Sequence, residues 1–216
     1  MVSIRKNSMN LFKIKLFVYK KPIQKRALTT EKRFLDALDS MLSDCSFTKL
    51  TIDAIALEAG LTRGAFIKRF GSKKQALFVL WERYCERASM EMGRIKATLP
   101  EYKLLEDACT HMSVSLEKIQ TLDFSANRAM HENFQENLEI DPTTKRIFLE
   151  CVELMRSAQR HFLKNKNYTD SGAFAAAQLL VTINYNYVLK AMSGLPPAPE
   201  DRHKMVGEII ALALNR

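Results

Sequence analysis

The sequence predicts an all-α protein of about nine helices, with a three-helix domain near the N-terminus and a larger helical domain behind it. Glycine and proline are scarce, at 7 and 6 of 216 residues, which favours long helices over many short strands. Hydrophobic residues make up 47% of the chain and recur with a helical period from Thr30 onwards, so a full core is available. We expect a basic extension at 1–23, a three-helix domain at 24–71 and a larger domain at 72–216.

The first expected helix carries an apolar stripe at helical spacing in the segment TEKRFLDALDSMLSD, with Thr30 as its N-cap. The stripe consists of Phe34, Leu35, Leu38, Met41 and Leu42. The following CSF interrupts the period, and Phe47 is expected to fold back onto the core.

Two short helices separated by a tight turn are expected within residues 51–70. Thr51 can cap the first helix, and Gly60 ends it where a left-handed residue is wanted. Thr62 can cap the second helix, which Gly71 closes. A helix, a glycine turn and a very short second helix have the spacing of a helix-turn-helix, whose second helix fits the DNA major groove.

The remaining chain is expected to form six helices. Ser72 and Gln75 make a capping box that opens a long helix running to Pro100. Asp141 followed by Pro142 is a further start signal. Five helices are expected after Pro100, at about 101–120, 125–138, 142–165, 171–193 and 200–215. Strand-like alternation occurs in LFKIKLFVY at 11–19.

Positive charge is concentrated in the N-terminal third of the chain. Residues 1–75 hold 16 Lys and Arg against 6 Asp and Glu, whereas the rest of the chain holds 17 against 18. Such asymmetry suggests a polyanionic partner, either nucleic acid or an anionic membrane surface. The membrane is disfavoured because residues 30–75 alternate core and surface positions as a compact domain does.

Patterns that would indicate an enzyme or a metal protein are incomplete. HENFQ at 131–135 begins like a zinc-protease helix, but Gln135 stands where the second histidine is needed. Glycine-rich phosphate loops and G-x-S-x-G are absent. The four cysteines have no CxxC spacing. We therefore expect no catalysis, no metal and no cofactor, and thiols that are free and mostly buried in a reducing cytosol.

The N-terminal MVSIRKNSMNLFKIKLFVYKK begins like a targeting peptide. Lys13 and Lys15 interrupt its apolar stretch, however, and no small-residue cleavage site follows. It is interpreted as a basic arm, a short added element, or an upstream extension with the working start at Met9. As an arm it invites comparison with minor-groove arms, although disorder or weak, non-specific electrostatic help is the favoured interpretation. No apolar run approaches the ~20 residues of a membrane span.

The segment LTIDAIALEAGLTRGAFIKRFGSKKQAL, residues 50–77, resembles the DNA-binding domain of the TetR family of transcriptional regulators. The similarity extends back through the first helix to about Thr30, and the turn, the second helix and the next capping box follow one another at family spacing. The resemblance implies a regulator that binds double-stranded operator DNA, with an all-helical second domain that binds an effector. It also implies a cytoplasmic, nucleoid-associated protein.

Carried over to this sequence, the resemblance implies eight DNA-binding positions. They are Thr51, Thr62, Arg63, Gly64, Ile67, Lys68, Arg69 and Lys73. Arg63 is the expected base-reading residue, because arginine can pair bidentately with guanine. The other basic residues are expected at phosphates, which position a protein without specifying sequence. For Arg69, pairing with an acidic group inside its own domain is the alternative.

Three positions depart from the family pattern. Ser46 stands where the family usually has glycine, so that turn needs another geometry. Ile67 stands where the family often has a tyrosine that touches the DNA backbone, and Gly71 replaces a common proline.

The larger domain is expected to hold an apolar effector pocket with a few polar anchors. The candidate ligand-binding residues are Trp81, Tyr84, His111, Met112, Phe134, Asn184 and Tyr185. Ordinary core or dimer packing is the alternative for each. In the family the last two helices pack against their two-fold copies, and the helices at about 171–193 and 200–215 are apolar enough to form such a homodimer.

The mechanism implied by the resemblance is release of a repressor. A ligand-free dimer would bind a pseudo-palindromic operator, and a small, largely apolar effector would shift the fourth helix, 72–98, to weaken binding. Two alternatives stay open. One is an activator of the same family, and the other is a helical interaction module that uses its basic face on a protein or membrane partner.

Overall fold

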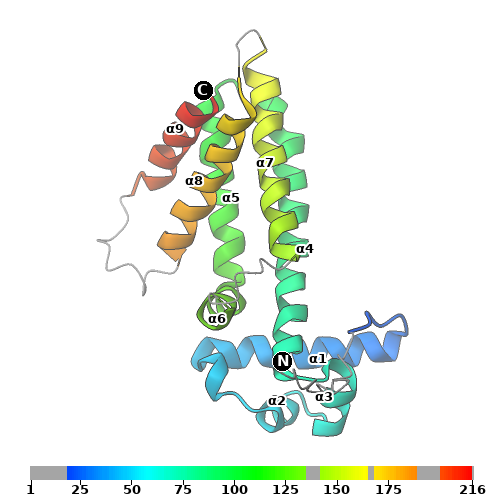
Figure 1. Ribbon diagram of the computed structural model, residues 1–216. Helices are drawn as coiled ribbons and strands as arrows, with labels where there is room; N and C mark the ends of the chain where they lie inside the picture. The colour runs from blue at the N-terminus through cyan, green and yellow to red at the C-terminus, as the bar shows by residue number, and fades with distance from the viewer. Residues whose placement is uncertain (1–18, 135–141, 165–167, 189–199, 216) are drawn as a thin grey trace, which may run out of the picture.

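The computed structural model describes residues 19–134, 142–164, 168–188 and 200–215, and within these ranges the chain is helical with no strand (Figure 1). The α-helices are α1 Lys25–Asp44, α2 Ile52–Glu58, α3 Arg63–Phe70, α4 Lys73–Thr98, α5 Leu105–Leu122, α6 Phe124–Phe134, α7 Pro142–Phe162, α8 Asp170–Val188 and α9 Arg202–Leu214. Two 3₁₀ helices are η1 Phe47–Lys49 and η2 Leu99–Glu101. The predicted all-α fold is confirmed. The strand-like stretch at 11–19 lies outside the described residues except for Tyr19.

The helices form two parts joined by a long helix. In Figure 1, α1, α2 and α3 lie together at the foot of the molecule, and α4 rises from them into a bundle with α5, α7, α8 and α9. The short helix α6 lies where the two parts meet and contacts both α1 and α4. α4 and α6 are therefore the two helices that connect the bundle with α1 of the N-terminal domain in the described part of the chain.

Three phenylalanines form the centre of the N-terminal domain. Phe34 of α1 and Phe66 and Phe70 of α3 are fully buried, with ring centroids 5.2, 6.0 and 5.0 Å apart. Phe34 meets the other two rings edge to face, the arrangement that aromatic quadrupoles favour. The same core continues into α4 and α6, to which α6 contributes Ala126 and Ala129. The predicted domain boundary at 71/72 is thus crossed by shared packing.

Side-chain caps begin three successive helices. The hydroxyl oxygens of Thr51, Thr62 and Ser72 accept hydrogen bonds from backbone amides three residues further on, at 3.1, 3.2 and 3.1 Å. Gly60 and Gly71 follow α2 and α3 with φ of 60° and 74°, in the region that glycine adopts without steric cost. The predicted caps and helix ends of the helix-turn-helix are confirmed.

The predicted start of the first helix is wrong. α1 begins at Lys25, and Thr30 lies inside it, where its hydroxyl donates to Arg26 O at 3.0 Å. Residues 25–29 contain good helix formers and no breaker, so the helix extends back toward Pro22. Phe47 is buried in the core, as predicted.

Two glycines let helices of the larger domain cross closely. A Cβ atom on Gly207 of α9 would lie 2.3 Å from Thr110 Oγ1 and 2.7 Å from Thr110 N of α5. A Cβ atom on Gly172 of α8 would lie 2.9 Å from Ala213 O of α9. The bundle therefore depends on the missing side chains at these two crossings.

The helix ends in the larger domain differ from prediction by a few residues. α5 begins at Leu105 rather than near 101, because Pro100 sits in the 3₁₀ helix η2. The predicted ends at 135–138, 165 and 189–193 lie outside the described residues.

The four cysteines are free thiols, and all but Cys45 are buried. Burial raises the pKa of Cys109 and Cys151 to about 12, so both are un-ionised and unreactive at neutral pH.

Candidate nucleic-acid interface

One face of α3, together with its N-cap, forms an exposed ridge that no other described element covers. It consists of five of the eight positions predicted to meet DNA, all of them exposed: Thr62, Arg63, Gly64, Ile67 and Lys68. They share one face because α-helical neighbours recur every three to four residues. The opposite face carries Phe66 and Phe70 into the core. We call these five residues the α3 ridge, and its width is that of a single helix.

Arg63 is held at the tip of the α3 ridge by an acidic residue of α2. Arg63 Nη1 lies 2.6 Å from Asp53 Oδ2, and the two side chains are 59% and 65% exposed. An ion pair this exposed stabilises the fold very little, so it can open when a better partner arrives. Because the Arg63 side chain is 59% exposed, a phosphate or a base edge can reach its guanidinium and replace Asp53 as its partner.

Lys73, predicted to meet phosphate, is bound to the turn before α2. Its Nζ donates to Phe47 O at 2.6 Å and to Leu50 O at 2.7 Å, and it lies 4.4 Å from the centre of the Phe47 ring. Burial lowers the pKa of the ammonium group. Lys73 therefore fixes residues 47–50, which lead directly to Thr51. Contact of Lys73 or Thr51 with DNA stays a prediction.

The turn at Ser46 has an ordinary geometry without the family's glycine. Ser46 is extended, with φ of −67°, and its hydroxyl shares a 3.1 Å hydrogen bond with Thr48 Oγ1. A φ in this range is open to any residue, so serine serves as well as glycine there.

Arg69 points into its own domain rather than outward. Its Nε lies 3.0 Å from Glu31 Oε2, in an ion pair without hydrogen-bond geometry at Nε, and both side chains are largely buried. Its Nη2 donates to Lys20 O, and its guanidinium lies 5.4 Å from the centre of the Tyr19 ring. The alternative of pairing inside the domain is thus the arrangement observed, and Arg69 is a structural residue in this state.

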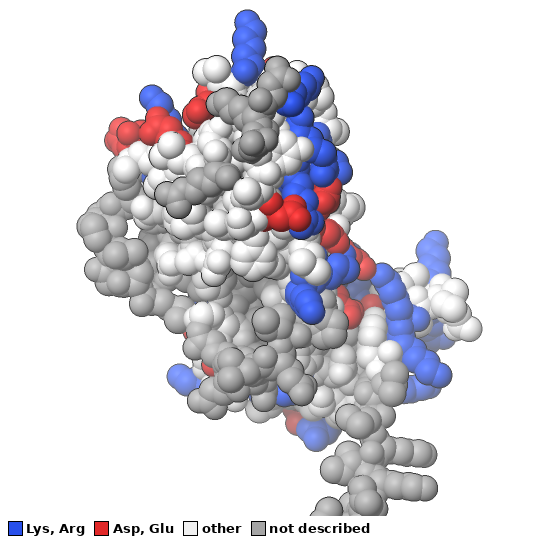
Figure 2. All heavy atoms as spheres, turned by 45° about the horizontal axis from the view of Figure 1, so that its top comes forward, with Lys and Arg blue, Asp and Glu red and all other residues white. Residues whose placement is uncertain are grey.

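Basic side chains also gather on the larger domain, along the side of α4 and α7 (Figure 2). Acidic side chains are interspersed with them in this view, and several pairs are in contact. Arg160 lies 2.6 Å from Glu153, and Arg146 lies 2.7 Å from Glu150. Neighbouring carboxylates therefore offset part of the positive charge on this flank.

The family of the N-terminal part follows from sequence comparison. Residues 34–79 match the family described as bacterial regulatory proteins, tetR family. The chain carries a TetR-family DNA-binding domain. The matched residues include α2, α3 and the first turns of α4, so the α3 ridge occupies the place of the recognition helix. A search of curated proteins found no significant match.

Solved structures show that the TetR-like fold extends over most of the chain. A TetR-family regulator from Marinobacter aquaeolei VT8 is 15% identical, with a TM-score of 0.63 over 90% of this chain and 100% of that one. NalD of Pseudomonas aeruginosa, the secondary repressor of the MexAB-OprM multidrug efflux pump, is 14% identical, with a TM-score of 0.59 over 89% of this chain and 99% of that one. FadR of Bacillus subtilis in complex with stearoyl-CoA is 14% identical, with a TM-score of 0.58 over 85% of this chain and 97% of that one. At these identities the likeness shows the fold alone.

The TetR-like larger domain gathers some of the predicted ligand residues and separates others. Trp81 and Tyr84 of α4 stack with ring centroids 4.6 Å apart, and Trp81 Nε1 donates to Thr144 Oγ1 of α7 at 3.0 Å. Tyr185 of α8 packs against His131 of α6 at 5.3 Å. Burial raises the pKa of Tyr84, and nearby Cys85 and Tyr185 add smaller increases. These residues form an aromatic cluster where α4, α6, α7 and α8 meet.

The other predicted ligand residues lie apart from this aromatic cluster. Asn184 is buried against α5, where its Nδ2 donates to Ser113 O at 3.1 Å, and Met112 is buried in the bundle core. His111 stacks on Tyr102 at 5.6 Å. The side chain of Phe134 is outside the described part of the structure. Ordinary packing, the stated alternative, accounts for the positions of Asn184 and Met112.

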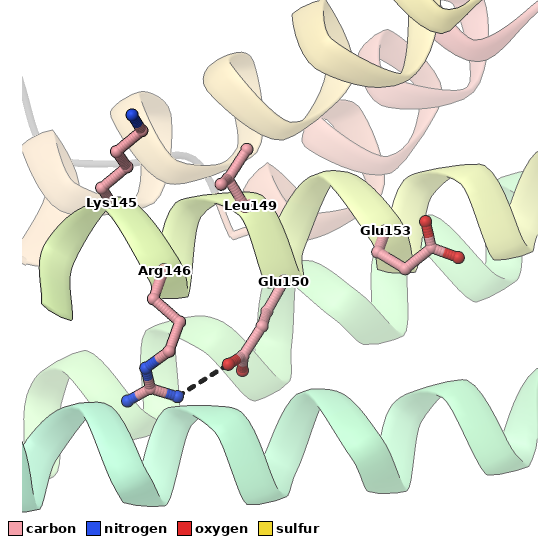
Figure 3. A pocket seen from close by; sticks show the side chains of 5 residues that line it. All are labelled: Lys145, Arg146, Leu149, Glu150 and Glu153. Carbon is pink, nitrogen blue, oxygen red and sulfur yellow. Dashed lines mark hydrogen bonds and ion pairs between the residues drawn. The ribbon is translucent and has the colours of Figure 1, made fainter. Parts of the chain in front are cut away.

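An open hollow of about 410 Å³ lies on the outer surface of α7 (Figure 3). Lys145, Leu149 and Glu153 project from one side of the helix, and Arg146 and Glu150 pair on the other. None of the seven predicted ligand residues lines it. Its charged rim and single apolar residue make it unlike an enclosed pocket for an apolar effector.

Helix α6 holds contacts that the sequence alone did not predict. Arg128 donates to Leu42 O at the end of α1, and Ser125 shares a 3.0 Å hydrogen bond with Ser43. The buried carboxylate of Asp123, just before α6, is held from both oxygens by Arg87 of α4. The clue in the sequence was the small residues of FSANRAM, which permit close packing.

Within the described residues no helix could span a membrane, and no group of side chains is arranged to hold a metal ion.

Proposed function

We propose that the chain is a homodimeric repressor that binds a pseudo-palindromic operator through the α3 ridge and is released by a small, largely apolar effector. The observation that carries this proposal is the α3 ridge itself, an uncovered helix face on a TetR-family helix-turn-helix. In this proposal Arg63 reads a base edge in the major groove. Lys68, with Thr62 and Ile67, lies against the DNA backbone.

Exposed apolar side chains on the last two helices support the dimer. Phe174 and Leu179 of α8 are 48% and 37% exposed, and Ile209 and Leu212 of α9 are 42% and 70% exposed. Exposed apolar side chains on two neighbouring helices are typical of an interface. Packing it against its two-fold copy would place two α3 ridges for half-sites one DNA turn apart, about 34–36 Å.

The aromatic cluster supports an effector that is largely apolar. Its polar groups are the Tyr84 and Tyr185 hydroxyls, the Thr144 hydroxyl, the indole N–H of Trp81 and the imidazole of His131. Apolar walls with a few such groups suit a ligand of low charge. FadR of Bacillus subtilis, with the same fold, has been solved with stearoyl-CoA, so a fold of this kind accepts a ligand with a long acyl chain.

The contacts of α4 and α6 support a route from the effector to the DNA-binding domain. α4 carries Trp81 and Tyr84 in the aromatic cluster and Lys73 on the turn before α2. α6 carries His131 next to Tyr185 at one end and Arg128 on α1. A ligand that binds one arrangement of α4 and α6 better than another would shift operator affinity by the same differential, typically ~1–3 kcal/mol.

A gel-shift titration tests the proposal. Purified protein is titrated onto duplexes from the DNA upstream of its own gene and onto scrambled duplexes of equal length. The proposal predicts tight, salt-sensitive binding to one pseudo-palindromic duplex. With ~6–10 phosphate contacts the affinity should fall by ~10³–10⁵ between 50 and 200 mM salt. Uniform, weak binding to every duplex would refute it and favour the interaction module with a protein or membrane partner.

The second candidate function is activation of transcription, for which the protein would make the same contacts with DNA. In vitro transcription from the bound promoter separates the two. A repressor lowers transcript yield when the protein is added and restores it with effector, whereas an activator raises the yield.

A further inference from the structure

The ion pair between Asp53 and Arg63 places a carboxylate next to the α3 ridge. Asp53 lies in the first turn of α2, and Arg63 is the first residue of α3. The two short helices lie together at the foot of the molecule, away from the bundle (Figure 1). Asp53 Oδ2 and Arg63 Nη1 are 2.6 Å apart, close enough for a charge-assisted hydrogen bond. Because negative charge weakens the binding of phosphates, a carboxylate at this position needs an explanation.

The stability of the fold does not explain the pair. Both side chains are more than half exposed, and an ion pair in water contributes little to folding. A carboxylate in the first turn of α2 is favoured by the helix dipole, but salt screens this effect. Neither contribution requires the carboxylate to reach Arg63, the residue proposed to read a base.

The pair leaves part of the guanidinium free for DNA. Arginine carries five N–H donors in a rigid plane. Asp53 occupies Nη1, and no other described residue accepts a hydrogen bond from Arg63. The edge formed by Nε and Nη2 therefore remains for bidentate pairing with O6 and N7 of guanine. Binding costs a long side chain its conformational freedom, and Asp53 restricts Arg63 before DNA arrives.

The same carboxylate distinguishes a phosphate from a base edge. A phosphate bound to Arg63 would bring its negative charge close to Asp53, whereas the edge of a base carries no net charge. Two like charges about 4 Å apart in water repel each other enough to change an affinity about fivefold. At Arg63, phosphate is thus disfavoured relative to a base by the charge of Asp53.

We propose that Asp53 is a specificity-determining residue, which orients Arg63 toward a base edge and repels phosphate from it. This inference rests on the proposed operator binding by the α3 ridge. Asp53 positions Arg63 and does not itself read the base. Non-specific complexes depend on phosphate contacts, so the carboxylate weakens binding to a wrong sequence more than binding to the operator.

The variant Asp53→Asn tests this role, because it keeps the shape of the side chain and removes its charge. Fluorescence anisotropy at about 100 mM salt measures two dissociation constants. One is for the duplex that the gel-shift titration identifies as the operator, and the other is for a scrambled duplex of equal length. Binding to the scrambled duplex should tighten about fivefold, and binding to the operator should change little. The preference for the operator should therefore fall about fivefold.

Two comparisons separate this role from charge and from folding. The control Glu58→Gln removes the same charge from the opposite end of α2, where Glu58 is exposed, and should change both constants by one factor. In a protein that already carries Arg63→Ala, Asp53→Asn should leave the preference unchanged, because Asp53 acts through Arg63. A merely structural role would lower the melting temperature of Asp53→Asn and would not depend on Arg63.

The outcomes distinguish this role from the proposed function. An unaltered preference in Asp53→Asn, or an equal fall in Glu58→Gln, would overturn the role of Asp53 while the unaltered protein still prefers its operator. The same fall with and without Arg63 would overturn it too. If the unaltered protein binds operator and scrambled duplex alike, the proposed function fails, and the role of Asp53 fails with it.

Discussion

Replacing Lys73 by methionine should destabilise the N-terminal domain. In the structure the Lys73 ammonium group donates to Phe47 O at 2.6 Å and to Leu50 O at 2.7 Å and lies on the Phe47 ring. Methionine keeps an unbranched apolar chain of similar length but has no donor. The substitution therefore removes the bonds that hold the 47–50 turn and leaves the packing of the stem nearly unchanged.

The expected loss follows from the two hydrogen bonds. A hydrogen bond to a charged group is worth about 1.5–3 kcal/mol, and a cation–π contact adds about 0.5–1 kcal/mol. Lys73 is half-buried, so water can reach the freed carbonyls and recover part of the lost hydrogen-bond free energy. We expect a net loss of about 2–3 kcal/mol, which for a chain of this size lowers the melting temperature by about 4–12 °C.

Thermal melting followed by circular dichroism measures this loss, with Lys74→Met as the control. Lys74 lies on the same turn and is exposed, with its ammonium group 5.8 Å from the Phe78 ring, so its replacement should cost within about 0.5 kcal/mol. Equal melting temperatures for the two variants would refute the reasoning. Lys73 would then be a solvated side chain free for phosphate, as the family resemblance implies.

Three further predictions concern other parts of the molecule. Gly207→Ala should destabilise the fold by about 1–3 kcal/mol, because the added methyl would lie 2.3 Å from Thr110 Oγ1. The control Gly93→Ala, on an open helix surface, should be neutral or stabilising by up to about 1 kcal/mol. Urea unfolding of both variants measures the difference, and equal midpoints would contradict the close helix crossing. Burial raises the pKa of the Asp39 carboxyl in the folded protein. At pH values above the pKa of the unfolded chain, about 3.9, the ionised carboxylate therefore lowers the free energy of unfolding. Asp39→Asn should therefore be more stable at pH 7, with the gain disappearing as the pH falls below about 3.9; a gain that is the same at both pH values would contradict this origin. Arg63→Ala should cost about 1–3 kcal/mol at the operator and relax preference at one base position without changing the melting temperature, since its Asp53 pair is exposed; an equal loss on every duplex sequence would show that it does not read bases.

The local signals of the helix-turn-helix were sufficient to predict its structure. Thr51, Thr62 and Ser72 cap their helices through short-range hydrogen bonds that depend on neighbouring residues alone. Gly60 and Gly71 take the positive φ values that their positions required. The fold class followed from the same regular periodicity.

The start of α1, the particular partners of Arg69 and the place of α6 could not be predicted. Thr30 has the chemistry of a cap, but residues 25–29 continue the helix, and nothing at Thr30 signals this. The direction of Arg69 depends on Glu31 and Tyr19, which meet it only in the folded chain. The place of α6 between the domains depends likewise on tertiary packing, since small residues such as Ala126 suit many interfaces.

Footprinting of the protein on the DNA upstream of its own gene tests the central claim most directly. The account predicts two protected half-sites related by a two-fold axis, with centres about 34–36 Å apart along one face of the duplex. It also predicts that Arg63→Ala changes which bases are required inside each half-site. Protection that spreads without symmetry over any sequence, or no protection at about 100 mM salt, would contradict the account.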